Sequence, residues 1–135
     1  MEVMKQIYVL NDFDETALPI MKVNSEYVLE NGITHICKYK KENPSTKVLL
    51  DAKIGDFDYH LIENEKLKDI DFITVQATSQ YKTISYVLHK AHEANMEVVM
   101  DVSGVHNLND VLENLMLYGV DYVRVDNDDL IKLKN

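Results

Sequence analysis

Val48-Leu49-Leu50-Asp51 and Val98-Val99-Met100-Asp101 are two short apolar stretches that lie 50 residues apart, and each ends in an aspartate. Two more apolar stretches, residues 72–75 and 122–125, are also 50 residues apart. All four are short and rich in β-branched, aromatic or other large apolar residues, which is typical of buried strands. They start at residues 48, 72, 98 and 122, so the steps are 24, 26 and 24 residues. This spacing predicts a repeated unit of one strand and one connecting segment.

The connecting segments have the apolar spacing of amphipathic helices. Apolar side chains recur at i, i+3, i+4 and i+7 from Ile84 to Ala91 and from Leu108 to Leu115. Gly119 is expected to end the second of these helices, and an earlier helix is predicted over residues 33–40, before Pro44. Strands that alternate with helices at this spacing indicate βαβ units and a parallel sheet.

The chain is too short for a full barrel of eight such units. It has 135 residues, whereas a (β/α)8 barrel needs at least about 200. Two more strands are predicted at residues 6–10 and 18–23, but the segment between them is too short for a crossover helix. We therefore expect one α/β domain over residues 1–135, a (β/α)-barrel type parallel sheet of about six strands that is incomplete. A smaller doubly wound sheet is the alternative.

Charge and composition limit the partners and the compartment. The chain has 14 Lys and Arg against 23 Asp and Glu, a net charge of −9, which disfavours nucleic-acid and membrane-surface binding. We expect no membrane span and no secretory signal. The single cysteine, Cys37, fits a reducing compartment, so a cytoplasmic protein is expected.

The stretch Asp51-Ala52-Lys53-Ile54-Gly55-Asp56 stands out among the polar residues expected at the carboxyl ends of the strands. Alternation along a strand would put Asp51 and Lys53 on one face, with Asp56 on the turn beyond. Such an array between apolar walls could hold a cation, move a proton or stabilise an enediolate. An ion pair at a strand end without a chemical role would have the same spacing.

Residues 48–56, VLLDAKIGD, contain the Asp-x-Lys-x-x-Asp signature of the orotidine 5′-phosphate decarboxylase superfamily. The stretch resembles 3-hexulose-6-phosphate synthase and its relative 3-keto-L-gulonate-6-phosphate decarboxylase in particular. The resemblance continues through residues 71–75, 97–108 and 119–123, and covers about residues 26–125. It implies a phosphosugar lyase, either a magnesium-dependent aldolase that joins formaldehyde to D-ribulose 5-phosphate or the decarboxylase.

The resemblance also implies roles for four residues. Asp51 would bind Mg²⁺, and Lys53 would lie beside the reacting carbon. Asp56 would reach across a homodimer interface into the partner's site. Asp101 has the place of a carboxylate that the synthases carry on their fifth strand.

Other positions depart from the family. Lys22 stands where the family has a glutamate that shares the Mg²⁺, and we expect it to pair with Asp51 and weaken metal binding. Asp126 stands where the family has a histidine, the family's first-strand aspartate falls near Asn11 or Asp12, and the glycine-rich phosphate loops of the last two strands are not found. A non-catalytic, truncated paralogue that acts as a dimerising module therefore remains an alternative, as does a piece of a longer enzyme.

The incomplete sheet also predicts self-association. Six parallel strands that do not close would leave two open edges, one at the first strand pair and one at residues 122–125. Unpaired backbone groups on apolar strands favour pairing with another chain. We therefore expect a homodimer or a larger homo-oligomer.

Overall fold

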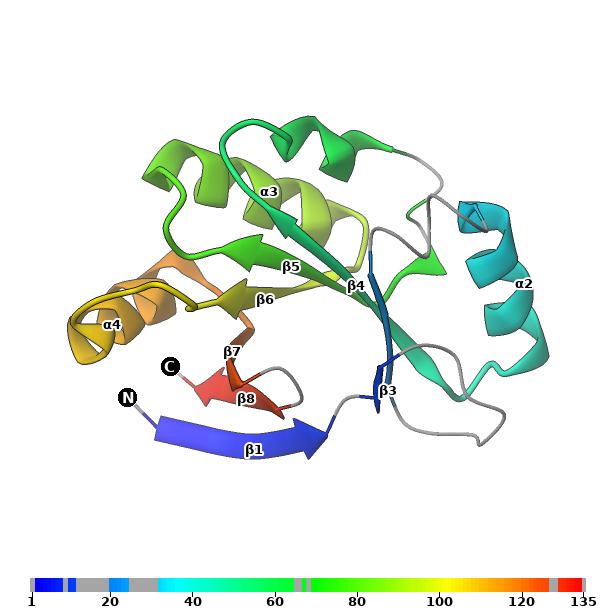
Figure 1. Cartoon of the computed structure of the whole chain (residues 1–135), viewed down its shortest axis with the longest axis horizontal. Helices are drawn as coiled ribbons and strands as arrows, with labels where there is room; N and C mark the ends of the chain where they lie inside the picture. The colour runs from blue at the N-terminus through cyan, green and yellow to red at the C-terminus, as the bar shows by residue number, and fades with distance from the viewer. Residues whose placement is uncertain are drawn as a thin grey trace.

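The computed structural model describes residues 2–8, 10–11, 20–24, 32–64, 67, 69–126 and 129–134. They form one eight-stranded sheet with helices packed around it (Figure 1). The helical elements are α2 (Ile33–Glu42), the short 3-10 helix η1 (Tyr59–Glu63), α3 (Tyr81–Glu93) and α4 (Leu108–Tyr118). The strands are β1 (Glu2–Tyr8), β2 (Leu10–Asn11), β3 (Ile20–Asn24), β4 (Lys47–Ile54), β5 (Phe72–Gln76), β6 (Glu97–Asp101), β7 (Tyr122–Asp126) and β8 (Asp129–Lys134).

Six of the strands, β2 to β7, lie side by side in chain order and are all parallel. The prediction of a barrel-type parallel sheet of about six strands is therefore confirmed. The helices α3 and α4 are the crossovers that connect β5 to β6 and β6 to β7. Gly119, with a φ of 89°, follows α4 in the left-handed conformation that commonly ends a helix.

The expectation of an open edge at β7 is wrong. β8 follows β7 directly and pairs with it in antiparallel orientation, with Val123 opposite Ile131. β1 then pairs antiparallel with the other side of β8. An antiparallel hairpin needs only a short turn, whereas the chain-length argument allowed only for a helical crossover. The last residues of the described chain therefore cover the edge that was expected to be exposed.

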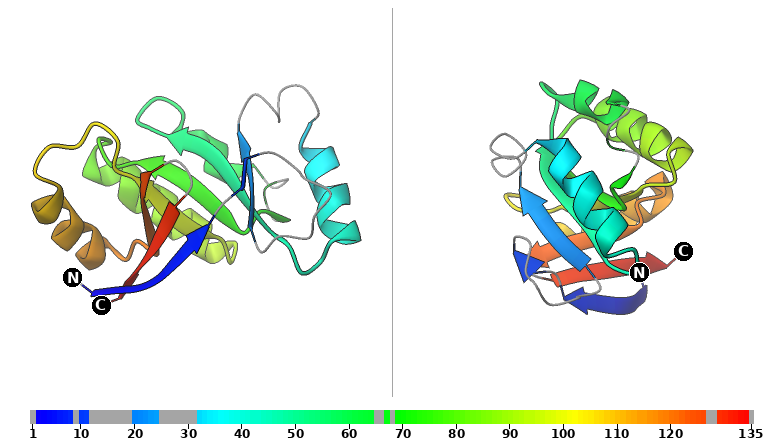
Figure 2. Two further views of the ribbon diagram at one scale, coloured as in Figure 1. Left: turned by 60° about the horizontal axis from the view of Figure 1, so that its bottom comes forward. Right: turned by 90° about the vertical axis from the view of Figure 1, so that its right-hand side faces the viewer.

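The N-terminal segment pairs with both ends of the sheet. The strand order is β1-β8-β7-β6-β5-β4-β3-β2, so β1 and β2 are the outermost strands. They are nevertheless separated in the chain by a single residue, which can bridge only a few ångströms. The sheet must therefore curl until its two ends meet, as the views in Figure 2 show.

The two faces of the curled sheet are both buried. Outward-facing residues of β3 to β7, among them Val48, Ile73 and Val98, pack against the helices in the larger core. The inward-facing residues form a separate cluster in which the rings of Phe72 and Tyr122 meet edge to face, with centroids 5.3 Å apart. The full inner cluster is Leu49, Phe72, Val99 and Tyr122.

This inner cluster consists of two pairs of residues that are 50 positions apart, so the repeat found in the sequence is also a structural repeat. The same holds at the opposite, amino-terminal end of the strands, where two equivalent aspartates each bind a backbone N–H and a basic helix side chain. The contacts are those of Asp71 Oδ2 with Val48 N (2.8 Å) and Lys40 Nζ (2.5 Å), and of Asp121 Oδ2 with Val98 N (2.9 Å) and His92 Nε2 (2.8 Å).

We predict that Phe72→Ala lowers the free energy of unfolding by about 3–5 kcal/mol, because it removes a buried ring and its partner contact with Tyr122. Urea denaturation followed by circular dichroism would measure the change. Leu117→Ala is the control, since this side chain is 83% exposed and its loss should change stability by less than about 0.5 kcal/mol. Equal effects of the two substitutions would contradict the inner core.

Candidate functional site

A polar layer lies beyond the apolar inner cluster, toward the carboxyl ends of β4 to β7. Each of its members comes two residues after a member of the cluster on the same strand, and period-two alternation puts both on the inner face. The members are Asp51, Thr74, Asp101 and Arg124.

Arg124 is the centre of this layer. Its Nη2 donates to Oδ1 of Asp51 and to Oδ2 of Asp101, both at 2.8 Å. The Arg124 side chain is 3% exposed, and the two carboxylates are 9% and 6% exposed. One buried guanidinium therefore bridges two buried carboxylates on different strands.

Further hydrogen bonds fix the two carboxylates. Thr74 Oγ1 donates to Asp51 Oδ1 at 2.9 Å, and the backbone N–H of Ser103 donates to Asp101 Oδ1 at 2.9 Å. Burial raises the pKa of Asp101, but hydrogen bonds from Ser103 and Arg124 outweigh it, so the pKa is below its ordinary value. Burial lowers the pKa of Arg124, but the bonds to both aspartates leave it raised. Asp101 and Arg124 are therefore held in their charged forms.

Lys53 lies beside the buried layer rather than in it. Between Leu50 and Ile54 the pairing of β4 with β5 shifts, because the bulged strand has two more residues than its partner over this interval. Lys53 has a φ of 47°, and its backbone N–H donates to Thr74 Oγ1 at 2.8 Å. The bulge interrupts the strict alternation that was expected, and the side chain of Lys53 is exposed while Asp51 is nearly buried.

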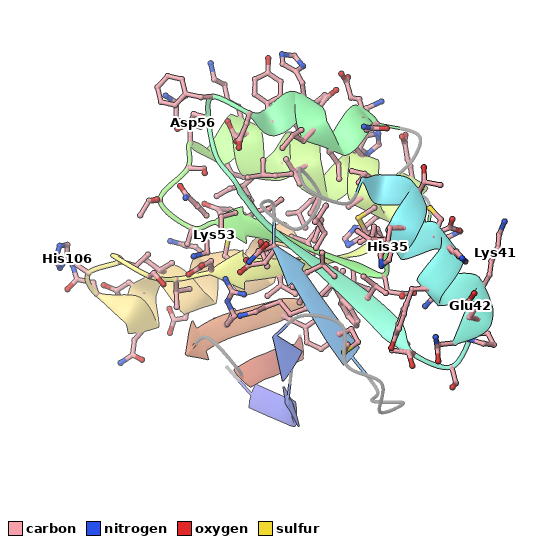
Figure 3. All side chains as sticks on the ribbon, turned by 45° about the vertical axis from the view of Figure 1, so that its right-hand side comes forward. His35, Lys41, Glu42, Lys53, Asp56 and His106 are labelled. Atoms are coloured by element: carbon pink, nitrogen blue, oxygen red, sulfur yellow. The ribbon has the colours of Figure 1, made fainter. Side chains whose placement is uncertain are left out.

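A pocket of about 320 Å³ lies between the loop after β4 and the loop after β5. Figure 3 shows Lys53 near the strand ends and Asp56 farther out on the loop. The lining residues are Lys53, Gly55, Asp56, Phe57, Asp58, Gln76, Thr78 and Ser79.

Asp56 is bound to the start of α3 in the same chain. Its Oδ1 accepts hydrogen bonds from Thr83 Oγ1 at 2.6 Å and from the backbone N–H of Gln80 at 3.0 Å. These two bonds hold the pKa of Asp56 below its ordinary value. A carboxylate in this position satisfies free N–H groups of the first helical turn and stabilises the helix.

Comparison with known proteins places this geometry in a family. No family model matches the chain. Among curated proteins, it is 24% identical to 3-hexulose-6-phosphate synthase of Bacillus subtilis over 111 residues, which are 82% of this chain and 53% of that protein. It is 28% identical to the synthase of Staphylococcus aureus over 108 residues, 78% of this chain and 50% of that protein. The chain is a divergent relative of the 3-hexulose-6-phosphate synthases. It spans about half the length of the curated synthases that it matches.

Solved structures of this family have the same fold. The synthase from Salmonella typhimurium superposes with a TM-score of 0.72 over 87% of this chain and 62% of its own, at 24% identity. The 3-keto-L-gulonate-6-phosphate decarboxylase from Vibrio cholerae gives a TM-score of 0.68 over 79% of this chain and 50% of its own, at 19% identity. The synthase-like sheet thus accounts for most of this chain.

Relative to the expectations from the sequence, Asp51 and Asp101 come together, and Lys53 and Asp56 line the adjacent pocket. The expected partner of Asp51 is corrected, because its ion pair is with Arg124 on β7 and not with Lys22, whose register partner is Leu49. Asp12 and the side chain of Asp126 lie outside the described residues.

Arg124 is the residue that the sequence analysis missed. A signal was present, because a lone charged residue at the centre of the apolar strand Tyr122-Val123-Arg124-Val125 is expensive to bury unless it is paired. Its inward position, 50 residues after Thr74, would have placed it with the site.

The synthase resemblance implies a magnesium ion, so we tested the described residues for a fit. Mg²⁺ prefers several oxygen ligands in octahedral geometry. In the part of the chain that the structure describes, no group of three or more acidic, histidine or cysteine side chains could hold a metal ion. Asp51 and Asp101 are bridged by the Arg124 guanidinium, which would oppose a divalent cation beside them. The arrangement of these side chains therefore does not fit Mg²⁺.

None of the described helices is long and apolar enough to cross a membrane.

We predict that Asp101→Asn lowers the free energy of unfolding at pH 7 by about 3 kcal/mol or more, because it breaks a buried ion pair. Since folding lowers the pKa of Asp101 from an ordinary value of 3.8, its stabilising effect is complete above that pH and is lost as the pH falls through the folded pKa. Urea midpoints measured at pH 7 and pH 3 should therefore differ more for the wild type than for Asp101→Asn. Asp110→Asn, at an exposed helix position, is the control, and an identical pH dependence of Asp101→Asn and the wild type would contradict the prediction.

Proposed function

We propose that this chain binds a phosphosugar at the carboxyl ends of β4 to β7 and catalyses the aldol reaction of 3-hexulose-6-phosphate synthase. That reaction joins formaldehyde to D-ribulose 5-phosphate or splits the product. The proposal depends on one observation, that Asp51, Lys53 and Asp101 of a synthase-like sequence meet at one end of a synthase-like sheet. A structure of 3-keto-L-gulonate-6-phosphate decarboxylase from Streptococcus mutans in complex with D-ribose 5-phosphate has the same fold, with a TM-score of 0.68, and supports a phosphosugar as the ligand class.

Lys53 is the residue best placed to act on the substrate. Aldol cleavage leaves negative charge on the sugar oxygens, and a fixed ammonium group stabilises that charge in the transition state. The exposed Lys53 side chain lines the pocket, and its backbone is held in a strained left-handed conformation. The hydrogen bonds from Lys53 N to Thr74 and from Thr74 to Asp51 link this conformation to the buried layer.

Asp51 and Asp101 have a positioning role in this proposal. Both carboxylates are used to hold Arg124, so neither is free to act as a base while the ion pairs are intact. The same observation favours a second candidate function, a non-catalytic module that binds the phosphosugar without turnover. Decarboxylation of 3-keto-L-gulonate 6-phosphate is a third outcome, which a matching assay can distinguish.

We predict that the wild-type chain releases formaldehyde from 3-hexulose 6-phosphate and that Lys53→Ala lowers kcat/KM by about 100-fold or more. Lys41→Ala is the matched control, because Lys41 lies on α2, away from Lys53 (Figure 3), and its loss should leave the rate unchanged. A colorimetric formaldehyde assay would measure both.

Three other outcomes would replace this function. Binding of D-ribulose 5-phosphate by calorimetry without turnover would support the non-catalytic module. Release of CO₂ from 3-keto-L-gulonate 6-phosphate would support the decarboxylase. Neither turnover nor binding would overturn all three functions.

We also propose that the chain forms a homodimer or a larger homo-oligomer in the cytoplasm. The support comes from the loop after β4 and no longer from an open edge at β7. Phe57 in this loop is fully exposed, next to Asp56, and lines a second pocket with Tyr59 and Tyr86. A fully exposed aromatic ring beside a pocket is typical of an interaction surface.

We predict that sedimentation velocity at micromolar concentration gives a species of at least twice the chain mass of 15.6 kDa. Phe57→Ser should shift it toward the monomer, because the interface loses a large apolar contact. Leu117→Ser, at another exposed apolar side chain, is the control and should leave the sedimentation unchanged. A wild-type monomer would contradict the proposal.

A further inference from the structure

The Arg124 side chain is buried, but its hydrogen-bonding capacity is only partly used. Nη2 donates to both Asp51 and Asp101, whereas the buried Nη1 has no hydrogen-bond partner among the described residues. A buried guanidinium N–H without an acceptor is costly, because it has lost its water and gained nothing in return. Such a group at a candidate binding site is suited to an acceptor that comes with the ligand.

The position of Arg124 is also unusual within the repeat. Thr74, 50 residues earlier, has the equivalent place on β5 and makes a short contact with Asp51 through a hydroxyl group. Arg124 instead spans from β7 to β4 and contacts both equivalent aspartates of the repeat. A positive charge therefore sits between the two carboxylates that a divalent cation would have to share.

We infer that Arg124 is the built-in cation of this site. It takes the place of a divalent metal between Asp51 and Asp101, and its Nη1 is kept for an anionic oxygen of the ligand, such as an enediolate or carboxylate oxygen. Arginine suits both tasks, because its planar guanidinium stays charged and donates in several fixed directions. The ligand half of this inference rests on the proposed phosphosugar function, whereas metal exclusion does not.

Metal exclusion is tested with Mn²⁺ as the probe, by electron paramagnetic resonance or calorimetry. Wild type and Arg124→Lys should show no saturable binding at millimolar Mn²⁺. Arg124→Leu leaves Asp51 and Asp101 without their cation and should bind Mn²⁺ at least about 10-fold more tightly, with a matching rise in Tm when Mn²⁺ is added. The double variant Arg124→Leu/Asp101→Asn should lose this gain.

Two outcomes of that experiment would overturn the metal half of the inference. One is wild-type Mn²⁺ binding as tight as that of Arg124→Leu. The other is a folded Arg124→Leu variant that gains no affinity. If Arg124→Leu does not fold, Arg124→Gln, which keeps a hydrogen-bonding side chain without the charge, is judged by the same criterion.

The ligand half is tested with D-ribulose 5-phosphate in calorimetry. Wild-type binding should be unchanged by EDTA, and Arg124→Lys should weaken it at least about 10-fold, since an ammonium group cannot hold two carboxylates and present a second donor as the guanidinium does. Loss of wild-type binding in EDTA, or equal binding by Arg124→Lys, would overturn the inference. No wild-type binding at all would overturn the phosphosugar function instead, and the Mn²⁺ result would still decide metal exclusion.

Discussion

The buried ion pairs of Arg124 with Asp51 and Asp101 are the constraint on which the rest of this structure depends. β4 and β7 are three strand spacings apart, roughly 14 Å measured along the sheet. A side chain on β7 can contact β4 at 2.8 Å only because the sheet curls. The fold thus brings the three charges together. Each charge in turn needs the others, because an unpaired charge at this burial would be strongly destabilising.

The N-terminal segment and β8 maintain this curvature from the other side of the molecule. β1 pairs with β8, and β2 pairs with β3, although a single residue separates β1 from β2. A sheet that is paired at both ends by one short segment cannot flatten without breaking one set of hydrogen bonds. The barrel-like geometry of the site therefore does not require eight parallel strands.

The site combines a rigid buried layer with a strained, exposed neighbour. Thr74 joins the two, since its hydroxyl group donates to Asp51 and accepts from the backbone of Lys53. This link explains how the bulge in β4 can keep Lys53 in a left-handed conformation at the rim of the pocket. A relative of the synthases can in this way position its lysine with a guanidinium, where the family resemblance implies a metal.

The sequence alone determined the six parallel strands, the helices between them, the 50-residue repeat and the relationship to the synthases, because hydrophobic period and a local motif carry that information. It also identified Asp51, Lys53, Asp56 and Asp101 through the spacing of one motif and one repeat. Only the tertiary structure decided that Arg124 pairs with Asp51, that Lys53 leaves the strand's alternation, and that β8 covers β7. The physical reason is that these features depend on contacts between strands distant in the chain and on backbone conformation at a bulge, which no local pattern of residues encodes.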